Sequence, residues 1–125
     1  MSEAGRRDLL VVDDDSIIRT LLAAALGGHY DVVCVPNGAG VPALMAERKP
    51  DLVVLDINVP GSEGYALCAG VRDQATLQKV PILFMSVCHD DENFFASLKT
   101  GGNGFIQKPF EMPALKGRIE GMLRS

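Results

Sequence analysis

Three acidic residues stand directly behind a short apolar run near the amino terminus, in the stretch VVDDDS at residues 11–16. Two or three carboxylates held within about 5 Å repel one another by roughly 1–4 kcal/mol per pair at the effective dielectric constant of a protein surface. A cluster of this kind is therefore expected to bind a divalent cation. Oxygen ligands that leave positions for water favour Mg²⁺, with Mn²⁺ as the alternative ion, over Zn²⁺.

Further polar side chains follow later apolar runs at the same relative place. Asp56 follows the third run, Ser86 follows the fourth, and Lys108 with Pro109 comes after the fifth. A cation there could polarise a phosphoryl group on Asp56, while Lys108 and the Ser86 hydroxyl supply a positive charge and a hydrogen-bond donor to its oxygens. Because carboxylates can be covalent phosphoryl acceptors, this set of residues indicates phosphoryl transfer.

Five apolar runs of strand length must position these groups. Their hydrophobicity is continuous rather than alternating, which predicts strands covered on both faces. The predicted strands are residues 9–12, 32–35, 52–55, 82–85 and 105–107.

Segments with helical periodicity separate the strands. The first helix is predicted to begin after an N-cap at Asp15 or Ser16 and to end at Gly27-Gly28. Its apolar stripe consists of Ile17, Ile18, Leu21, Leu22, Ala25 and Leu26. Further helices are expected at residues 40–48, 64–71 and 91–100, and from about Glu111, where Leu115, Ile119, Met122 and Leu123 share one side.

Alternating strands and helices of this kind predict a doubly wound α/β fold, with a parallel sheet between two layers of helices. Ligands of such sheets bind beyond the carboxyl ends of the strands, where all the polar residues above are expected to meet. With 125 residues and no linker or repeat, we expect a single domain over residues 1–125, with its core at about 8–124 and no output domain.

The composition restricts the remaining function classes. Hydrophobic residues make up 47% and charged residues 22%, as in soluble globular proteins, and the net charge of −4 predicts no direct contact with nucleic acid or anionic membranes. Neither a signal peptide nor a membrane-spanning stretch is recognisable. The cysteines Cys34, Cys68 and Cys88 lack metal-site spacing and are expected to be reduced thiols in a cytoplasmic protein.

Four stretches, in this order and at these spacings, form a highly specific pattern: VVDDDS, DLVVLDINVPGSEGY, VPILFMS and GGNGFIQKPF. Through them essentially the whole chain resembles a response-regulator receiver domain of the CheY-like family. The resemblance implies a flavodoxin-like sheet of five parallel strands in the order 2-1-3-4-5, with five helices. It also implies signal transduction in a two-component system or phosphorelay.

The resemblance assigns the acidic residues individually. It implies that Asp56 is the phosphorylated residue and that Asp13 and Asp14 form the acidic pocket. Asp14 and Asp56 would bind Mg²⁺ through their side chains, Asp13 either directly or by way of water, and Asn58 through its backbone carbonyl.

The same resemblance gives roles to residues at the later strand ends. Ser86 would donate a hydrogen bond to the phosphoryl group, Lys108 would form an ion pair with it, and Phe105 would rotate with the phosphorylation state. Pro109 fits the family's cis proline, although the sequence leaves its isomer open.

The function implied is that of a phosphoacceptor rather than an enzyme with an external substrate. A sensor histidine kinase or phosphotransfer protein would supply the phosphoryl group. The downstream partner would bind the face formed by the helix at 91–100, the fifth strand and the fifth helix, and a weak homodimer is a further expectation. On that last helix Pro113, Gly117 and Gly121 form a flat stripe, which is consistent either with close packing of a partner or with a weak terminal helix.

Other interpretations remain open at this point. Val87 stands where the family usually has Ala or Gly, so the chain could be slow to be phosphorylated or could be a pseudo-receiver that only binds partners. An aspartate-dependent phosphohydrolase would need a carboxylate two residues after Asp56, where Asn58 stands. The three aspartates could also serve only as a turn and helix N-cap, and Phe105 could simply pack in the core.

Overall fold

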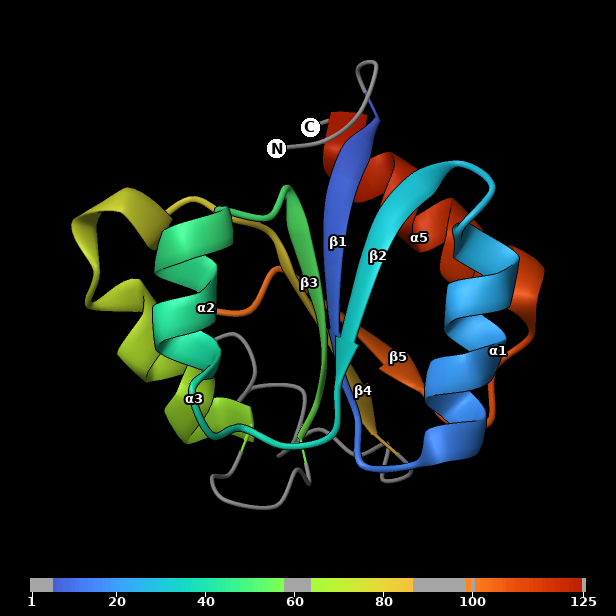
Figure 1. Cartoon of the computed structure of the whole chain (residues 1–125), viewed down its shortest axis with the longest axis horizontal. Coiled ribbons are helices and arrows are strands. Elements are labelled where there is room, and N and C mark those ends of the chain that lie inside the picture. The colour runs from blue at the N-terminus through green and yellow to red at the C-terminus, as the bar shows by residue number, and fades with distance from the viewer. Residues whose placement is uncertain (1–5, 58–63, 87–98, 100, 125) are drawn as a thin grey trace.

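The computed structural model of the chain describes residues 6–57, 64–86, 99 and 101–124. Strands and helices alternate along these residues (Figure 1). The elements are β1 (Arg7–Val12), α1 (Ser16–Leu26), β2 (Tyr30–Val35), α2 (Val41–Arg48), β3 (Leu52–Asp56), α3 (Gly64–Arg72), the 3₁₀ helix η2 (Ala75–Leu77), β4 (Ile82–Ser86), β5 (Gly104–Gln107) and α5 (Met112–Arg124).

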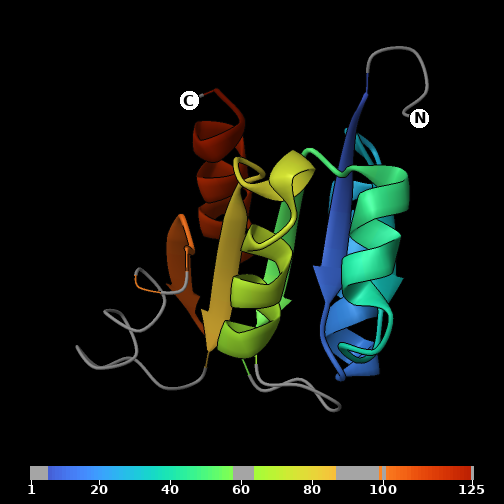
Figure 2. The same ribbon diagram turned by 90° about the vertical axis from the view of Figure 1, so that its left-hand side faces the viewer.

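The strands form one five-stranded sheet in the order β2-β1-β3-β4-β5, and every neighbouring pair is parallel. Helices α1 and α5 cover one face, and α2 and α3 cover the other; Figure 2 turns the second pair toward the viewer. The predicted fold class and strand order are therefore confirmed. The predicted helix at residues 91–100 lies almost entirely outside the described residues, and η2 was not predicted.

The core consists of two apolar layers, one on each face of the sheet. Side chains of successive strand residues point to opposite faces, so a continuous apolar run supplies both layers at once. On the side of α2 and α3 the layer includes Leu10, Val12, Val53, Leu55 and Phe84, whereas on the side of α1 and α5 it includes Leu9, Val11, Val54, Leu83 and Met85. The edge strand β2 is only half-buried along its whole length, which differs from the predicted full coverage, because it has a neighbour on one side alone.

Helix α1 has the predicted caps but a narrower buried stripe than predicted. Asp15 is the N-cap, and its Oδ1 accepts a hydrogen bond of 2.9 Å from the backbone N–H of Ile17. Leu22 and Leu26 are buried, whereas Ile17 is 67% exposed and Leu21 is 52% exposed. Burial of the whole stripe was wrong for Ile17 and Leu21, because each lies about 100° around the helix from the more buried residue that follows it: Ile18 is partly buried and Leu22 is buried.

The remaining helices begin and end close to the predicted positions. Helix α2 accommodates Pro42 in its first turn, where a missing N–H costs no helical hydrogen bond. Helix α5 buries Leu115 and Ile119 completely, and Met122 and Leu123 pack against the same core layer at its end. These two helices thus confirm the predictions made from Pro42 and from the apolar spacing.

Candidate functional site

The register of the two central strands brings Asp13 and Asp56 together. Strands β1 and β3 pair in parallel, with Val12 opposite Leu55, so the next residue of each chain segment is an aspartate. Neighbouring strands lie about 4.8 Å apart. Because side chains alternate between the two faces along each strand, both aspartates point to the face of the sheet that α1 and α5 cover. Both are buried: Asp13 is 0% exposed and Asp56 is 6% exposed.

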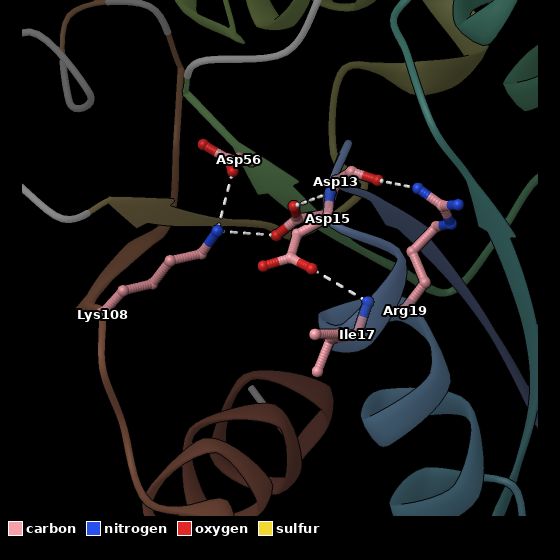
Figure 3. Close-up of polar contacts among 6 residues, drawn as sticks. All are labelled: Asp13, Asp15, Ile17, Arg19, Asp56 and Lys108. Atoms are coloured by element: carbon pink, nitrogen blue, oxygen red, sulfur yellow. Dashed lines mark hydrogen bonds and ion pairs between the residues drawn. The ribbon is translucent and has the colours of Figure 1, made fainter.

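Lys108, just beyond β5, connects the two carboxylates. Its Nζ lies 2.7 Å from Oδ2 of Asp13 and 2.8 Å from Oδ2 of Asp56 (Figure 3). The backbone N–H of Lys108 donates a 2.7 Å hydrogen bond to the carbonyl of Ser86, which fixes the residue beside β4. The peptide bond between Lys108 and Pro109 is cis.

A third carboxylate completes an acidic cluster. One oxygen each from Asp13, Asp14 and Asp56 lies within 4.8 Å of the others, and Asp14 is exposed to solvent. Among the described residues, Lys108 is the cation that forms ion pairs with these carboxylates. Three carboxylates and one ammonium leave two formal negative charges. A hard, oxygen-only donor set with this charge fits Mg²⁺.

The electrostatics of the pair are asymmetric. Burial raises the pKa of the Asp13 carboxyl, and the hydrogen bond from Lys108 opposes this shift without cancelling it. Burial alone would lower the pKa of Lys108, but its hydrogen bonds to Asp13 and Asp56 and their negative charges outweigh burial, so its pKa is raised. The difference arises because Asp13 is completely buried and faces a second carboxylate, whereas Lys108 faces two opposite charges. Lys108 therefore stays charged at neutral pH.

The three consecutive aspartates have different structural roles. Oδ1 of Asp13 accepts a 2.9 Å hydrogen bond from the N–H of Asp15, and Oδ1 of Asp15 caps α1. The turn-and-cap interpretation is thus correct for Asp15 and for one oxygen of Asp13. It does not account for the other oxygen of Asp13, which binds Lys108, or for Asp14 in the acidic cluster.

Two further predicted residues are buried close to this edge of the sheet. Ser86 ends β4 and is 0% exposed; the residue before it, Met85, pairs with Asp56. Phe105 is 6% exposed and lies beside Phe84 in the core layer under α2 and α3. The predicted positions of Asn58 and Val87 lie outside the described residues.

Comparison with known proteins identifies the family. The family model of the response regulator receiver domain matches residues 9–120. The chain belongs to this family. The receiver domain is 37% identical over 123 residues to the transcriptional regulatory protein YvcP of Bacillus subtilis, covering 94% of this chain and 48% of that protein. It is 32% identical over 120 residues to the phosphate regulon regulator PhoB of Pseudomonas aeruginosa, covering 94% and 52%.

A solved structure agrees with this assignment. The receiver domain matches the BeF3-activated N-terminal receiver domain of Klebsiella pneumoniae RstA with a TM-score of 0.86 and 37% identity, covering 94% of this chain and 99% of that one. The chain spans about half the length of the two transcriptional regulators named above.

Membership of the family carries several general properties. Receiver domains are signalling domains of two-component response regulators; they bind Mg²⁺ at an acidic pocket and interact with histidine kinases. This receiver domain has an acidic cluster, formed by Asp13, Asp14 and Asp56. None of the helices within the described ranges is long and apolar enough to cross a bilayer.

Three features near the site were not predicted from the sequence. Nη1 of Arg19 donates a 2.9 Å hydrogen bond to the backbone carbonyl of Asp13, and Nη1 of Arg118 donates one of the same length to the carbonyl of Phe105. A groove that includes Leu21 and Phe110 leads to Lys108. Of these three features, only the groove could have been anticipated from the sequence. The apolar stripe predicted for α1 contains more residues than one helix face can bury, so some apolar side chains had to remain at the surface.

Proposed function

We propose that this receiver domain accepts a phosphoryl group on Asp56 in a Mg²⁺-dependent reaction and thereby changes the surface it offers to a partner. The donor would be the phosphohistidine of a sensor kinase or phosphotransfer protein. The observation that carries the proposal is Lys108 Nζ held between Asp13 and Asp56, with Asp14 at the open side of the same cluster.

The transfer itself needs no external substrate. A carboxylate oxygen of Asp56 forms the new P–O bond while the P–N bond of the donor breaks and its electron pair returns to the imidazole. The ammonium of Lys108 is already within hydrogen-bond distance of Asp56, so it can neutralise charge on the incoming phosphoryl oxygens without a large movement.

Asp13, Asp14 and Asp56 are the described residues that would hold Mg²⁺, with the carbonyl of Asn58 as a predicted further ligand. When bound, the ion would offset the charge of the carboxylates and polarise the phosphoryl oxygens. The protein's own contribution is to hold buried carboxylates at a distance where a dication is the favourable occupant.

The donor is proposed to approach along the groove between α1 and the segment after β5. Ile18 and exposed Leu21 line the groove on α1, and Phe110 and Met112 line it on the other side. Lys108, which belongs to the acidic site, also lines the groove. An apolar helix seated there would hold its phosphohistidine next to Asp56. A donor helix is favoured over an unrelated ligand because one residue that lines the groove, Lys108, also contacts the acceptor.

The response is proposed to be a shift in population between two states. The phosphoryl group would favour the state in which Ser86 and Phe105 move toward it. The partner would recognise the changed surface on α5 and β5. Among the residues that the structure describes, none has an atom within 4 Å of a methyl group added at Gly117 or Gly121. The predicted flat stripe is therefore proposed to be accessible to a partner or second copy.

The test is incubation with acetyl phosphate and Mg²⁺, followed by intact mass measurement. We expect a mass gain of one phosphoryl group that requires Mg²⁺, persists in Asp73→Asn and disappears in Asp56→Asn. Asp73 is exposed and remote from the cluster, so it controls for a lost carboxylate. Absence of labelling in the wild type would favour the pseudo-receiver, and repeated turnover of a phosphomonoester would favour the phosphohydrolase.

A further inference from the structure

Asp13 is held through all of its polar groups. Its N–H donates to the carbonyl of Val35 at 3.1 Å, its Oδ1 accepts from Asp15 and its Oδ2 accepts from Lys108. Its backbone carbonyl accepts from Nη1 of Arg19 at 2.9 Å. Three of these bonds come from the sheet, the turn and the ion pair, and the fourth comes from a side chain on α1.

The carbonyl of Asp13 has no place in regular secondary structure. Strand β1 ends at Val12, and the first helical bond at this end of α1 runs from the N–H of Arg19 to the carbonyl of Asp15. Because Asp13 is completely buried, an unpaired carbonyl there would lose its hydrogen bond to water without a replacement, which destabilises the folded state. The guanidinium of Arg19 reaches back over the turn to pair with it (Figure 3).

The bond from Arg19 acts on the peptide plane that joins Asp13 to Asp14. A peptide unit is planar, so holding its oxygen fixes the direction in which the next residue leaves. Arg19 is itself anchored, since its own carbonyl accepts a 3.7 Å hydrogen bond from Sγ of Cys34 on β2. Arg19 thus connects three parts of the fold: its backbone carbonyl joins α1 to β2, and its guanidinium joins α1 to the turn that carries two carboxylates of the cluster.

On the basis of the proposed function, we propose that Arg19 is a positioning residue for the cation and phosphoryl site. By holding the peptide between Asp13 and Asp14, it keeps both carboxylates within reach of Asp56 before any ligand arrives. A residue that merely stabilised α1 would change the unfolding free energy but not the affinity of the folded protein for Mg²⁺.

The first measurement is a Mg²⁺ titration of the full chain followed by NMR. Arg19→Gln removes the guanidinium group. We expect it to weaken Mg²⁺ binding about tenfold, as is common when a residue that orients the metal ligands is replaced. Arg19→Lys should recover part of the affinity because an ammonium can donate to the same carbonyl. Arg48→Gln makes the same charge change at an exposed position of α2 and should leave the affinity unaltered.

Wild-type affinity in folded Arg19→Gln, or an equal loss in Arg48→Gln, would overturn the positioning role. If Arg19→Gln does not fold, the comparison passes to Arg19→Lys: an intermediate affinity supports the role, and an affinity equal to wild type contradicts it.

The second measurement is amide hydrogen exchange without Mg²⁺, which separates this proposal from the proposed function. In Arg19→Gln the N–H of Asp15, bonded to Oδ1 of Asp13, should lose protection, while that of Leu22 in the middle of α1 keeps it. Unchanged protection at Asp15 would contradict the positioning role. A wild type that accepts no phosphoryl group would refute the proposed function, and the exchange result would still decide whether Arg19 holds the turn.

Discussion

At the carboxyl end of the sheet Lys108 lies between two carboxylates, whereas at the amino end Arg72 lies among neutral groups. The Arg72 guanidinium donates twice to the carbonyl of Gly101, once to the carbonyl of Leu77 and once to Oδ1 of Asn103, at 2.7–3.1 Å. Each cation joins segments that are distant in the sequence. Lys108 connects the ends of β1, β3 and β5, and Arg72 connects α3 and η2 to the start of β5.

The pKa values of the two cations shift in opposite directions, although burial by itself lowers both. Burial lowers the pKa of Arg72, because carbonyl oxygens carry no full charge to compensate for lost water. At Lys108 the carboxylates outweigh burial and raise the pKa. The amino end is therefore a set of satisfied hydrogen bonds that serves stability. The carboxyl end retains excess negative charge on its carboxylates, which is costly for folding but favours binding of a cation.

The largest effect is expected for Lys108→Met. Removing the ammonium leaves two buried carboxylates without their cation, so the free energy of unfolding at pH 7 should fall by about 3 kcal/mol. The loss should shrink at pH 4, because burial raises the pKa of Asp13 and its carboxylate takes up a proton more readily there. Urea unfolding at both pH values measures this, with the exposed Lys79→Met as the control. A loss that is equal at both pH values would contradict the excess charge at this end.

Arg72→Met should lower the free energy of unfolding by about 2 kcal/mol, since buried carbonyls lose charged donors. In contrast to Lys108→Met, the loss should be the same at pH 7 and pH 4, because the acceptors do not titrate. The same urea experiment tests this, with the exposed Arg48→Met as control. A strong pH dependence would remove the distinction between the two ends.

Gly101→Ala should cost about 1 kcal/mol. Gly101 has a φ of +99°, which side chains rarely adopt, and an added methyl would lie 2.9 Å from Cγ of Arg72, whose guanidinium is fixed. Gly28→Ala has open space around it and should change stability little. Thermal unfolding of the two variants compares them directly, and equal melting temperatures would show that the amino end tolerates displacement of Arg72.

The smallest effect is expected for Asp13→Asn. Because the pKa of Asp13 is raised by folding, the native state binds its proton more tightly than the unfolded state, and stability falls as pH rises from 3.8 through the raised value. Asparagine removes this loss, so the variant should be slightly more stable than wild type at pH 7 and equal to it below pH 3.8. Urea unfolding across this range checks the sign. A variant less stable at pH 7 would mean that the bond to Lys108 outweighs burial.

Much of the fold followed from local patterns. Continuous apolar runs predicted the five strands, and caps such as Asp15 and Gly27 predicted the ends of α1. The exposure of Ile17 and Leu21 could not be predicted, since helical periodicity gives the direction of a side chain but not how far the neighbouring layer extends. The half-buried state of β2 likewise depends on its place at the edge of the sheet.

The candidate site likewise has a part that the sequence predicted and a part that it did not. Residue types and their places after predicted strands selected Asp13, Asp14, Asp56 and Lys108, because parallel strands end at one edge. The bond from Arg19 to the Asp13 carbonyl left no pattern in the sequence. A half-buried arginine on a helix has many possible acceptors, and the choice among them depends on how the turn and α1 are placed.

By itself, the sequence determined which groups are charged, which segments are apolar, and that acidic and basic residues follow successive strands. These are local properties of the chain, set by residue type and spacing. Only the tertiary structure decided that the strand register places Asp13 beside Asp56, that one ammonium joins both, and that an arginine holds the turn between them. Such distances depend on the packing of segments far apart in the chain, because hydrogen bonds and ion pairs change strength within a few tenths of an ångström.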